Sequence, residues 1–484
     1  MLTFTEDYFD TEVRDGFAVN ELMKRNWAAQ LKLLDMVLGI CEKYDLTYYI
    51  YWGTLLGAVR HKGYIPWDDD LDIAMKRDDY IKFLEVVEKE LPEECGVYNS
   101  YNEDDCAEIF TRVTNGRALD FSDRKLSQYH GCPFAVGIDI FPLYYIPRDT
   151  EQAAVQKAIL KYINVLGLAI RETYGEEKVV YDEEIKESLA ELEELTGFHF
   201  TENRPIRTQL AVLYDKVGRM YNEEDSDVLT FLGYYIQDDY VVEKELLGEG
   251  VMLPFEMIQL NAPKEFDVIL RKTYGEYMKP RRVKGGHDYP YYKGQLALLG
   301  DYIDQLDCKW KTEQVSPVGE LVTDEKTGVR FPKEWEEKLY LDNNRKRKVL
   351  LYHTSAAGLL GNGEYVVDKL RYIFEEIRGQ EDMVLWWFPT LLDNPEMQFI
   401  KEMSPRLVQE YHCLLEEYKK ENWGILDVSG DRQRAVAMSD AYYGDEGELL
   451  RLFKSTGRSV TLQEYESIES HEYDRQEEIC GGRD

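Results

Sequence analysis

Residues 65–75, with the sequence IPWDDDLDIAM, hold four aspartates within five positions: Asp68, Asp69, Asp70 and Asp72. Like charges this close repel one another, so the cluster indicates either a solvated acidic turn or a site for a cation. Apolar residues alternate with the acids, which predicts a half-buried strand with Asp70 and Asp72 on one face. Carboxylate oxygens without His or Cys in the same stretch favour Mg²⁺, or Mn²⁺, over Zn²⁺.

A short helix is predicted about 15 residues before this strand. The sequence TLLGAVRHKG begins with Thr54 as N-cap and ends at Gly63. Gly53 and Thr54 would place unpaired N–H groups and the positive end of the helix dipole beside a phosphate. Arg60 and Lys62 lie on or just after the helix and could reach the same anion.

A third isolated carboxylate, Asp139, lies in the predicted strand AVGIDIFPLYYIP at 135–147. A Gly-Thr helix, an Asp-x-Asp strand and a third Asp together suit metal-assisted phosphoryl or nucleotidyl transfer. In such chemistry a cation neutralises phosphate oxygens while a carboxylate accepts the proton of the attacking hydroxyl.

Three segments carry a resemblance to the LicD family of phosphotransferases, which are built on the nucleotidyltransferase fold. They are YWGTLLGAVRHKGYIPWDDDLDIAMKRDDYIKF at 51–83, GIDIFPL at 137–143 and LRKTYGEYMKPRRVKGGHDYP at 270–290. The resemblance extends from about residue 20 to 300. It implies transfer of phosphocholine from CDP-choline to a hydroxyl of a cell-surface glycan, such as teichoic acid or lipopolysaccharide. Eukaryotic relatives transfer ribitol phosphate from CDP-ribitol.

The resemblance also implies roles for particular residues. Gly53 and Thr54 match the turn at the donor phosphates, and Asp70 and Asp72 match the metal-binding pair. Asp139 lies where the third carboxylate, a ligand or a base, is expected.

Four further residues match basic or histidine positions of the family. Arg60 and Lys62 are expected to contact phosphate, and Arg112, in IFTRVTNGR, to contact substrate from a neighbouring strand. His287 belongs to the terminal motif and is also expected to bind substrate. His61 is a structural or a catalytic histidine on this reasoning.

The net charge of −35, from 93 acidic and 58 basic residues, disfavours nonspecific binding to nucleic acid or anionic lipid. No membrane span is expected, because no stretch approaches about 18 apolar residues. The N-terminus is acidic where a secretion signal would be basic and then apolar. The seven cysteines form no CxxC pair, which suits a reducing cytoplasm.

The chain is expected to be an α/β protein with two domains. Residues 1–310 would form an α+β nucleotidyltransferase-fold catalytic domain with a helical insert at about 150–245. A linker at 311–345 would lead to a Rossmann-like α/β domain at 346–465, where strand-like and helical segments alternate. Residues 466–484 are expected to be a polar tail.

The second domain resembles the nucleotide-binding half of CDP-glycerol glycerophosphotransferases, without their phosphate-binding residues. Trp387-Phe388-Pro389-Thr390 and Asp445-Glu446-Gly447-Glu448 stand at the comparable places. Acidic residues at a helix start would repel phosphate. A degenerate domain that binds the acceptor or forms a homodimer is therefore expected, with a second active site as the alternative.

Three functions follow from these observations. The leading hypothesis is a Mg²⁺- or Mn²⁺-dependent phosphotransferase that takes a phospho-alcohol from a CDP-alcohol donor and passes it to a glycan acceptor. The second is a nucleotidyltransferase that transfers NMP and releases pyrophosphate. The third is a non-catalytic glycan-binding scaffold.

Overall fold

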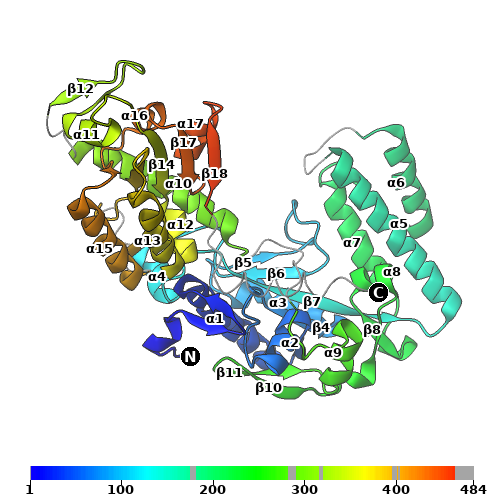
Figure 1. The fold of residues 1–484 in the computed structure, drawn as a ribbon. Coiled ribbons are helices and arrows are strands. Elements are labelled where there is room, and N and C mark those ends of the chain that lie inside the picture. Colours follow the sequence, from blue (N-terminus) through cyan, green and yellow to red (C-terminus); the bar gives the residue numbers. More distant parts are fainter. Residues whose placement is uncertain are drawn as a thin grey trace, which may run out of the picture. The chain divides into compact units, whose positions relative to one another are not determined.

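The computed structural model describes residues 2–174, 181–281, 290–314, 320–394, 400–401 and 404–463. These residues form two compact units, shown in Figure 1. Unit 1 consists of Met1–Leu2, Ala29–Ala118 and Ala135–Gly286, and unit 2 of Thr3–Ala28, Leu119–Phe134 and His287–Asp484. The 23-residue helix α1 (Glu21–Lys43) contains one of the boundaries.

Unit 1 is built on a mixed sheet in the order β3-β4-β7-β6-β5, with β8 paired to β7 and β9 to β8. Only β4 and β7 pair in parallel; the other neighbours are antiparallel. The strands are β3 (Tyr48–Ile50), β4 (Asp72–Lys76), β5 (Gly96–Tyr98), β6 (Thr111–Thr114), β7 (Gly137–Ile146), β8 (Val228–Thr230) and β9 (Val242–Glu243). The expected strands at 68–75 and 135–147 are therefore present as β4 and β7.

The helices of unit 1 follow the apolar periodicity of the sequence. They are α2 (Trp52–Arg60), α3 (Arg77–Glu90), α5 (Thr150–Tyr174), α6 (Glu183–Thr196), α7 (Ile206–Gly218), α8 (Leu232–Asp238) and α9 (Phe266–Tyr274), with short 3-10 helices η2 (Glu223–Asp225) and η3 (Lys244–Leu246). A hairpin of β10 (Val251–Phe255) and β11 (Ile258–Ala262) completes the unit.

The expected helical insert is present as α5 to α8. Its core is a cluster of buried side chains from α5, α6, α7 and α8. Asp182 caps α6 by accepting the Ile185 N–H at 3.0 Å, and Gly197 ends that helix with a left-handed φ of 68°.

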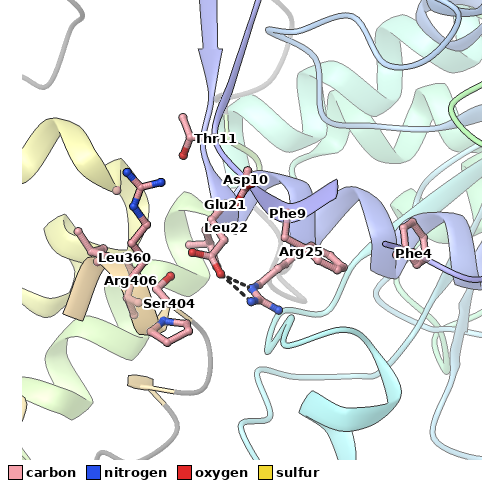
Figure 2. A pocket seen from close by; sticks show the side chains of 13 residues that line it. Phe4, Phe9, Asp10, Thr11, Glu21, Leu22, Arg25, Leu360, Ser404 and Arg406 are labelled. Atoms are coloured by element: carbon pink, nitrogen blue, oxygen red, sulfur yellow. Dashed lines mark hydrogen bonds and ion pairs between the residues drawn. The ribbon is translucent and has the colours of Figure 1, made fainter. Parts of the chain in front are cut away.

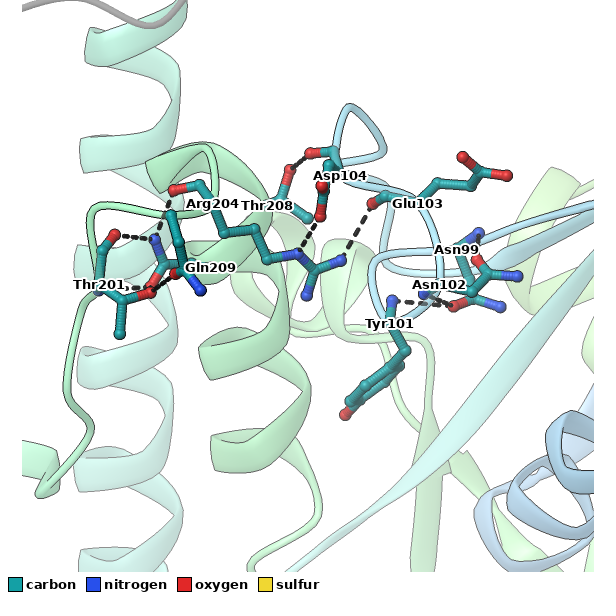
Figure 3. A network of polar contacts seen from close by, with 10 residues as sticks. Asn99, Tyr101, Asn102, Glu103, Asp104, Thr201, Arg204, Thr208 and Gln209 are labelled. Carbon is teal, nitrogen blue, oxygen red and sulfur yellow. Dashed lines mark hydrogen bonds and ion pairs between the residues drawn. The ribbon is translucent and has the colours of Figure 1, made fainter.

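A polar network ties the insert to the loop that precedes β6 (Figure 3). Arg204 Nε donates to Asp104 at 2.9 Å, and its Nη2 donates to the Glu103 carbonyl at 3.1 Å. The Thr208 hydroxyl donates to the Asp104 carbonyl. This network fixes the loop from which the chain enters β6, the strand that carries Arg112.

Helix α5 is long and apolar enough to cross a membrane, judged by length and composition alone. The sequence analysis did not anticipate a segment of this kind. Four of its apolar side chains, at positions 160, 163, 166 and 170, are buried in the core of the insert. Val155, Val165 and Leu168 are exposed.

Unit 2 contains a five-stranded parallel sheet in the order β16-β15-β14-β17-β18. The strands are β14 (Lys348–Thr354), β15 (Met383–Pro389), β16 (Ile425–Leu426), β17 (Ala441–Gly444) and β18 (Ser459–Leu462). All five lie within residues 346–465, where the sequence predicts alternating strand-like and helical segments. The expectation of a second α/β sheet with parallel strands is thus confirmed.

Helices and two small hairpins make up the rest of unit 2. The helices are α4 (Asp123–Gln128), α10 (Lys293–Gln314), α11 (Glu336–Leu339), α12 (Ala356–Asn362), α13 (Glu364–Arg378), α15 (Pro405–Glu421), α16 (Arg432–Met438) and α17 (Glu448–Lys454), with 3-10 helices η1 (Glu6–Phe9) and η4 (Lys333–Trp335). The hairpins pair β1 (Glu12–Arg14) with β2 (Phe17–Val19) and β12 (Leu321–Thr323) with β13 (Arg330–Pro332).

Residues 311–345, expected as a linker, contain the end of α10, the β12-β13 hairpin, η4 and α11. Phe331, Trp335 and Leu339 from this stretch lie in the hydrophobic core of the parallel sheet. The stretch differs from a linker because these three large side chains, spaced four residues apart, all find buried positions.

Candidate active site

A row of charged side chains crosses three strands of the unit 1 sheet. Asp72 is in register with Asp139 on the parallel strand β7, and Asp139 is in register with Arg112 on the antiparallel strand β6. Register partners share a face of the sheet and lie about 5 Å apart. We call Asp72, Asp139 and Arg112 the carboxylate row. Two acids that are 67 positions apart in sequence thus become neighbours.

The remaining aspartates lie in the segment that leads into β4. Because β4 begins at Asp72, Asp70 precedes the strand instead of sharing its regular alternation. Asp68 and Asp70 are half-buried and Asp69 is fully buried. Gln30 of α1 fixes this segment: its side-chain amide donates to the Asp69 carbonyl at 2.8 Å and to the Gly137 carbonyl, at the start of β7, at 3.2 Å.

The electrostatics of the row centre on Asp72. Burial raises the pKa of the Asp72 carboxyl well above its usual range, and the nearby charges of Asp70, Asp139 and Asp68 raise it further. The positive charge of Arg112 opposes these effects. A site in which negative charges penalise one another to this extent favours either a proton or a cation.

Arg112 and Asp139 form a two-bond ion pair. Arg112 Nε donates to Asp139 Oδ1 at 2.7 Å, and Nη2 donates to Oδ2 at 2.8 Å. The Asp139 side chain is 14% exposed and that of Arg112 is 52% exposed. Among the described residues, no group of three or more His, Cys, Asp or Glu side chains is arranged to hold a metal ion.

Thr54 acts on the carboxylate row through the backbone. The predicted N-cap role is wrong: α2 begins at Trp52, its N-cap is Tyr51, and its C-cap is His61. The reason is tertiary, since the buried Thr54 hydroxyl accepts the Asp72 N–H at 2.8 Å. Thr54 thereby joins the first turn of α2 to the first residue of β4.

We expect Thr54→Val to destabilise unit 1 by about 1–3 kcal/mol, because it leaves the Asp72 N–H buried without its acceptor. Thermal unfolding of the two proteins measures this difference. Thr54→Ser keeps the hydroxyl and should lose less. Valine keeps the methyl packing of Thr54 and serine does not, so a loss for serine alone would show that this packing, and not the hydrogen bond, determines the stability.

Gly53 lies against an acidic side chain at the first turn of α2. A Cβ at Gly53 would come within 2.7 Å of Asp68 Oδ2, so the absence of a side chain allows this approach. A carboxylate therefore already lies beside the N-terminus of α2, where the sequence analysis expected a donor phosphate. Phosphate binding by Gly53 and Thr54 stays a prediction.

Arg60 and Lys62 lie at the other end of α2, about 9 Å along the helix from Thr54. Arg60 Nη1 donates to the Tyr277 carbonyl at 3.0 Å. Lys62 is exposed, has a left-handed φ of 57°, and accepts the Glu256 N–H at its carbonyl at 2.7 Å. These contacts anchor the end of α2, and phosphate contacts by the two basic groups stay predictions.

The structure describes only one of the two histidines named in the sequence analysis. His61 lies edge-on to Trp67, with ring centroids 6.2 Å apart, and its Nδ1 lies 3.4 Å from Arg60 Nε. These contacts agree with the structural interpretation of His61. His287, the other candidate for substrate binding, lies outside the described residues.

Sequence reasoning missed several aromatic residues beside the row. Phe141 follows Asp139 by two positions on β7, so both side chains lie on the same face. Trp52 contacts Phe141, with ring centroids 4.5 Å apart, and it also contacts Phe231 and Tyr234 from the helical insert. Only Phe141 carried a sequence signal, its alternation with Asp139.

In unit 2 an internal carboxylate occupies the start of α12, at the carboxyl end of β14. Asp445 Oδ2 accepts the Ser355 N–H at 2.7 Å and the Ser355 hydroxyl at 3.0 Å. A Cβ at Gly358 would come within 2.1 Å of the same oxygen. In parallel α/β sheets this edge is where phosphates usually bind, so an anionic ligand here would have to displace Asp445.

Unit 2 also contains a cavity of about 410 Å³ between its N-terminal segment and the starts of α13 and α15 (Figure 2). Arg25 lines it and is paired with Glu21 at 2.6 Å. Arg406 lines the opposite side. None of the predicted site residues belongs to this cavity.

Residues 45–159 match the sequence model of one protein family, described as LicD/FKTN/FKRP, nucleotidyltransferase domain. This range contains α2, β4, β6 and β7, and therefore the whole carboxylate row.

Three curated proteins illustrate the similarity. The chain is 28% identical over 255 residues to the lipopolysaccharide cholinephosphotransferase LicD of Haemophilus influenzae, covering 51% of this chain and 88% of that protein. Over 48 residues it is 53% and 48% identical to uncharacterised proteins of Rickettsia typhi and Rickettsia prowazekii. Those two matches cover 10% of this chain and 16% and 18% of the respective relatives.

Proposed function

We propose, from the premise that this chain carries a LicD-family domain and is an enzyme of that phosphotransferase type, that it transfers phosphocholine from a CDP-linked donor to a glycan hydroxyl. The observation that supports the chemistry is the register of Asp72 with Asp139 on adjacent parallel strands. The observation that supports the substrate is the similarity to a lipopolysaccharide cholinephosphotransferase over 88% of that protein.

A divalent cation fits the acids of this site. Asp70 and Asp72 supply only oxygen ligands, as Mg²⁺ and Mn²⁺ prefer. Burial and then the neighbouring aspartates raise the pKa of Asp72, and a cation would relieve the repulsion among these acids. We propose that these two residues hold the ion, with Asp139 as a third ligand or as the base. When bound, the ion would neutralise the charge on the diphosphate of the donor.

The residues of the chain would then perform the following transfer. An acceptor hydroxyl attacks the phosphorus that carries the choline, the bond from that phosphorus to the bridging oxygen breaks, and CMP leaves. Asp139 accepts the hydroxyl proton: each of its oxygens keeps a second lone pair beside the bond to Arg112. Arg112 holds that carboxylate in place and lies within reach of phosphate oxygens.

The C-terminal domain and the location of the enzyme complete the proposal. We propose that the parallel sheet of unit 2 is a degenerate Rossmann-like domain, because Asp445 occupies the helix start where a nucleotide phosphate would bind. Acceptor binding and homodimer formation are the two roles proposed for it. A cytoplasmic site of action, where CDP-alcohols are made available, agrees with the cysteine pattern.

Product analysis tests the function. With CDP-choline, Mg²⁺ and lipopolysaccharide as the acceptor, we expect ³¹P NMR to show CMP and a new phosphodiester. In a separate reaction with CTP and phosphocholine as substrates, a nucleotidyltransferase would instead release pyrophosphate. A scaffold would produce neither, and either of those results would contradict the proposal.

We also expect Asp72→Asn to stabilise the protein in EDTA. A carboxyl whose pKa is higher in the folded state binds its proton more tightly there, so stability falls as the pH rises above the unfolded pKa of about 3.9. Asparagine has no carboxyl to ionise, so the variant does not lose stability in this way as the pH rises. At pH 7.5 we expect Tm to rise by about 2–4 °C, which corresponds to about 1 kcal/mol in a domain of this size.

The pH series provides the control for this prediction. The gain in Tm should shrink towards pH 4, where wild-type Asp72 is protonated in the folded protein. Asp78→Asn, at an exposed position in the first turn of α3, should show no such gain. A Tm for Asp72→Asn at or below that of the wild type at pH 7.5 would contradict the crowding argument.

A further inference from the structure

Four aromatic side chains from three segments of the chain meet beside the carboxylate row, and we call them the aromatic wall. They are Trp52 at the start of α2, Phe141 on β7, Phe231 before α8 and Tyr234 within α8. Ring centroids are 4.5 Å apart for Trp52 and Phe141, 5.2 Å for Phe141 and Phe231, and 5.7 Å for Trp52 and Tyr234. The rings pack edge to face, so they form one continuous surface.

The aromatic wall and the carboxylate row share a face of the sheet. Phe141 stands two residues beyond Asp139 on β7, which places it in the next row on the same side. Burial raises the pKa of the Tyr234 hydroxyl, and the nearby Asp72 raises it further. A group bound on the wall would therefore lie close to the carboxylate row.

The wall is open on the side of Tyr234. Tyr234 is 40% exposed, and Phe141 and Phe231 are half-buried. Trp52 is 9% exposed and has a left-handed φ of 41°, a conformation that costs a bulky residue of order 1–3 kcal/mol. Its buried indole N–H has no acceptor among the described residues. Backbone strain is typical of a functional site. The indole N–H would need an acceptor from another part of a ligand, because a quaternary ammonium has none.

We propose that the aromatic wall binds the quaternary ammonium group of the alcohol carried by the donor. The inference rests on the proposed function and names the residues that would select the transferred group. A quaternary ammonium is cationic, weakly hydrated and apolar at its surface, so it binds to aromatic faces by cation–π interaction.

Two other occupants fit the wall less well. A polyol such as ribitol needs several hydrogen-bonding partners, whereas the wall offers one tyrosine hydroxyl and one indole N–H. A cytosine base would stack on the rings but is neutral, so it would gain no cation–π attraction. Occupation by the base gives a distinct result in the experiment below.

Calorimetric titration in Mg²⁺ tests the inference with three probes: CDP-choline, its neutral isostere with carbon in place of the quaternary nitrogen, and CMP. We expect the wild type to bind CDP-choline about 3- to 30-fold more tightly than the isostere, the range that cation–π interactions give. In Tyr234→Leu this preference should fall by at least about threefold, while the affinity for CMP stays within about twofold.

Two variants control for nonspecific effects. Tyr234→Phe keeps the ring and should restore most of the preference. Tyr372→Leu removes an exposed tyrosine from α13 in unit 2 and should leave the preference unchanged. Tyr234 is 40% exposed, so its substitution is expected to leave the fold intact.

Three results would overturn the inference. Equal affinity of the wild type for CDP-choline and the isostere would show that the positive charge of the quaternary ammonium does not contribute to binding. An equal loss of CMP and CDP-choline affinity in Tyr234→Leu would assign the wall to the base. Both results leave the proposed function standing, whereas failure to bind any CDP-alcohol would contradict the proposed function together with the inference.

Discussion

Replacing Asp72 by asparagine is expected to lower kcat by about a thousandfold or more while the protein stays folded. The substitution removes one of two carboxylates proposed to hold the cation, and a metal ion supplies several kcal/mol of charge stabilisation in the transition state. About 4 kcal/mol corresponds to three orders of magnitude. The rate of CMP release from CDP-choline with a lipopolysaccharide acceptor measures the loss.

Asp78→Asn is the matched control for this experiment. It removes an aspartate six positions further along the chain, at an exposed site in the first turn of α3, and should retain wild-type kcat. Circular dichroism and thermal unfolding confirm that both variants fold. Activity of Asp72→Asn within tenfold of the wild type would exclude Asp72 as a metal ligand.

The second large effect is expected for Asp139→Asn, with kcat about 10²- to 10⁴-fold lower, the contribution typical of a general base. Asparagine keeps an acceptor for Arg112 but cannot take the proton of the acceptor hydroxyl. The pH profile of kcat is the decisive measurement. For the wild type we expect kcat to fall on the acidic side, as general-base catalysis requires, and for the variant we expect this limb to be absent.

A double-mutant cycle separates catalysis by Asp139 from its pairing with Arg112. If Asp139 serves only to hold Arg112, then Arg112→Gln, Asp139→Asn and the double variant should lose the same activity. The proposed role predicts a larger loss for Asp139→Asn than for Arg112→Gln. Equal losses with unchanged pH profiles would reduce Asp139 to a structural partner of Arg112.

The elements that position the site could be predicted because their apolar residues alternate regularly. The strands of the C-terminal sheet, for example Lys348–Thr354 and Met383–Pro389, lie in the region where strand-like and helical segments were predicted to alternate. The placement of Asp139 on a strand followed from the same alternation. Its register with Asp72 did not, since two strands 60 residues apart can pair in several registers.

The prediction of a linker at residues 311–345 was wrong because the structure of this segment depends on tertiary packing. The region is polar on average, yet Phe331, Trp335 and Leu339 are all buried in the core of unit 2. Their four-residue spacing was visible, but it spans a strand, a 3-10 helix and a short α-helix, so no single period describes it.

The start of α2 and the aromatic wall escaped sequence reasoning for a related reason. A hydroxyl before an apolar helix predicts an N-cap, but the Thr54 hydroxyl is used by the backbone of β4. The wall joins Trp52 to Phe231 and Tyr234, about 180 positions further along the chain. Among 36 tyrosines, nothing local distinguishes the one that meets Trp52.

The most direct test of Asp70 and Asp72 as a cation site is an EPR titration of Mn²⁺ into the protein with CMP present, at about 0.15 M salt to screen the acidic surface. The account predicts that the wild type and Asp78→Asn remove the signal of free Mn²⁺ up to one equivalent, and that Asp72→Asn does not. Indistinguishable titration curves for all three proteins would contradict it.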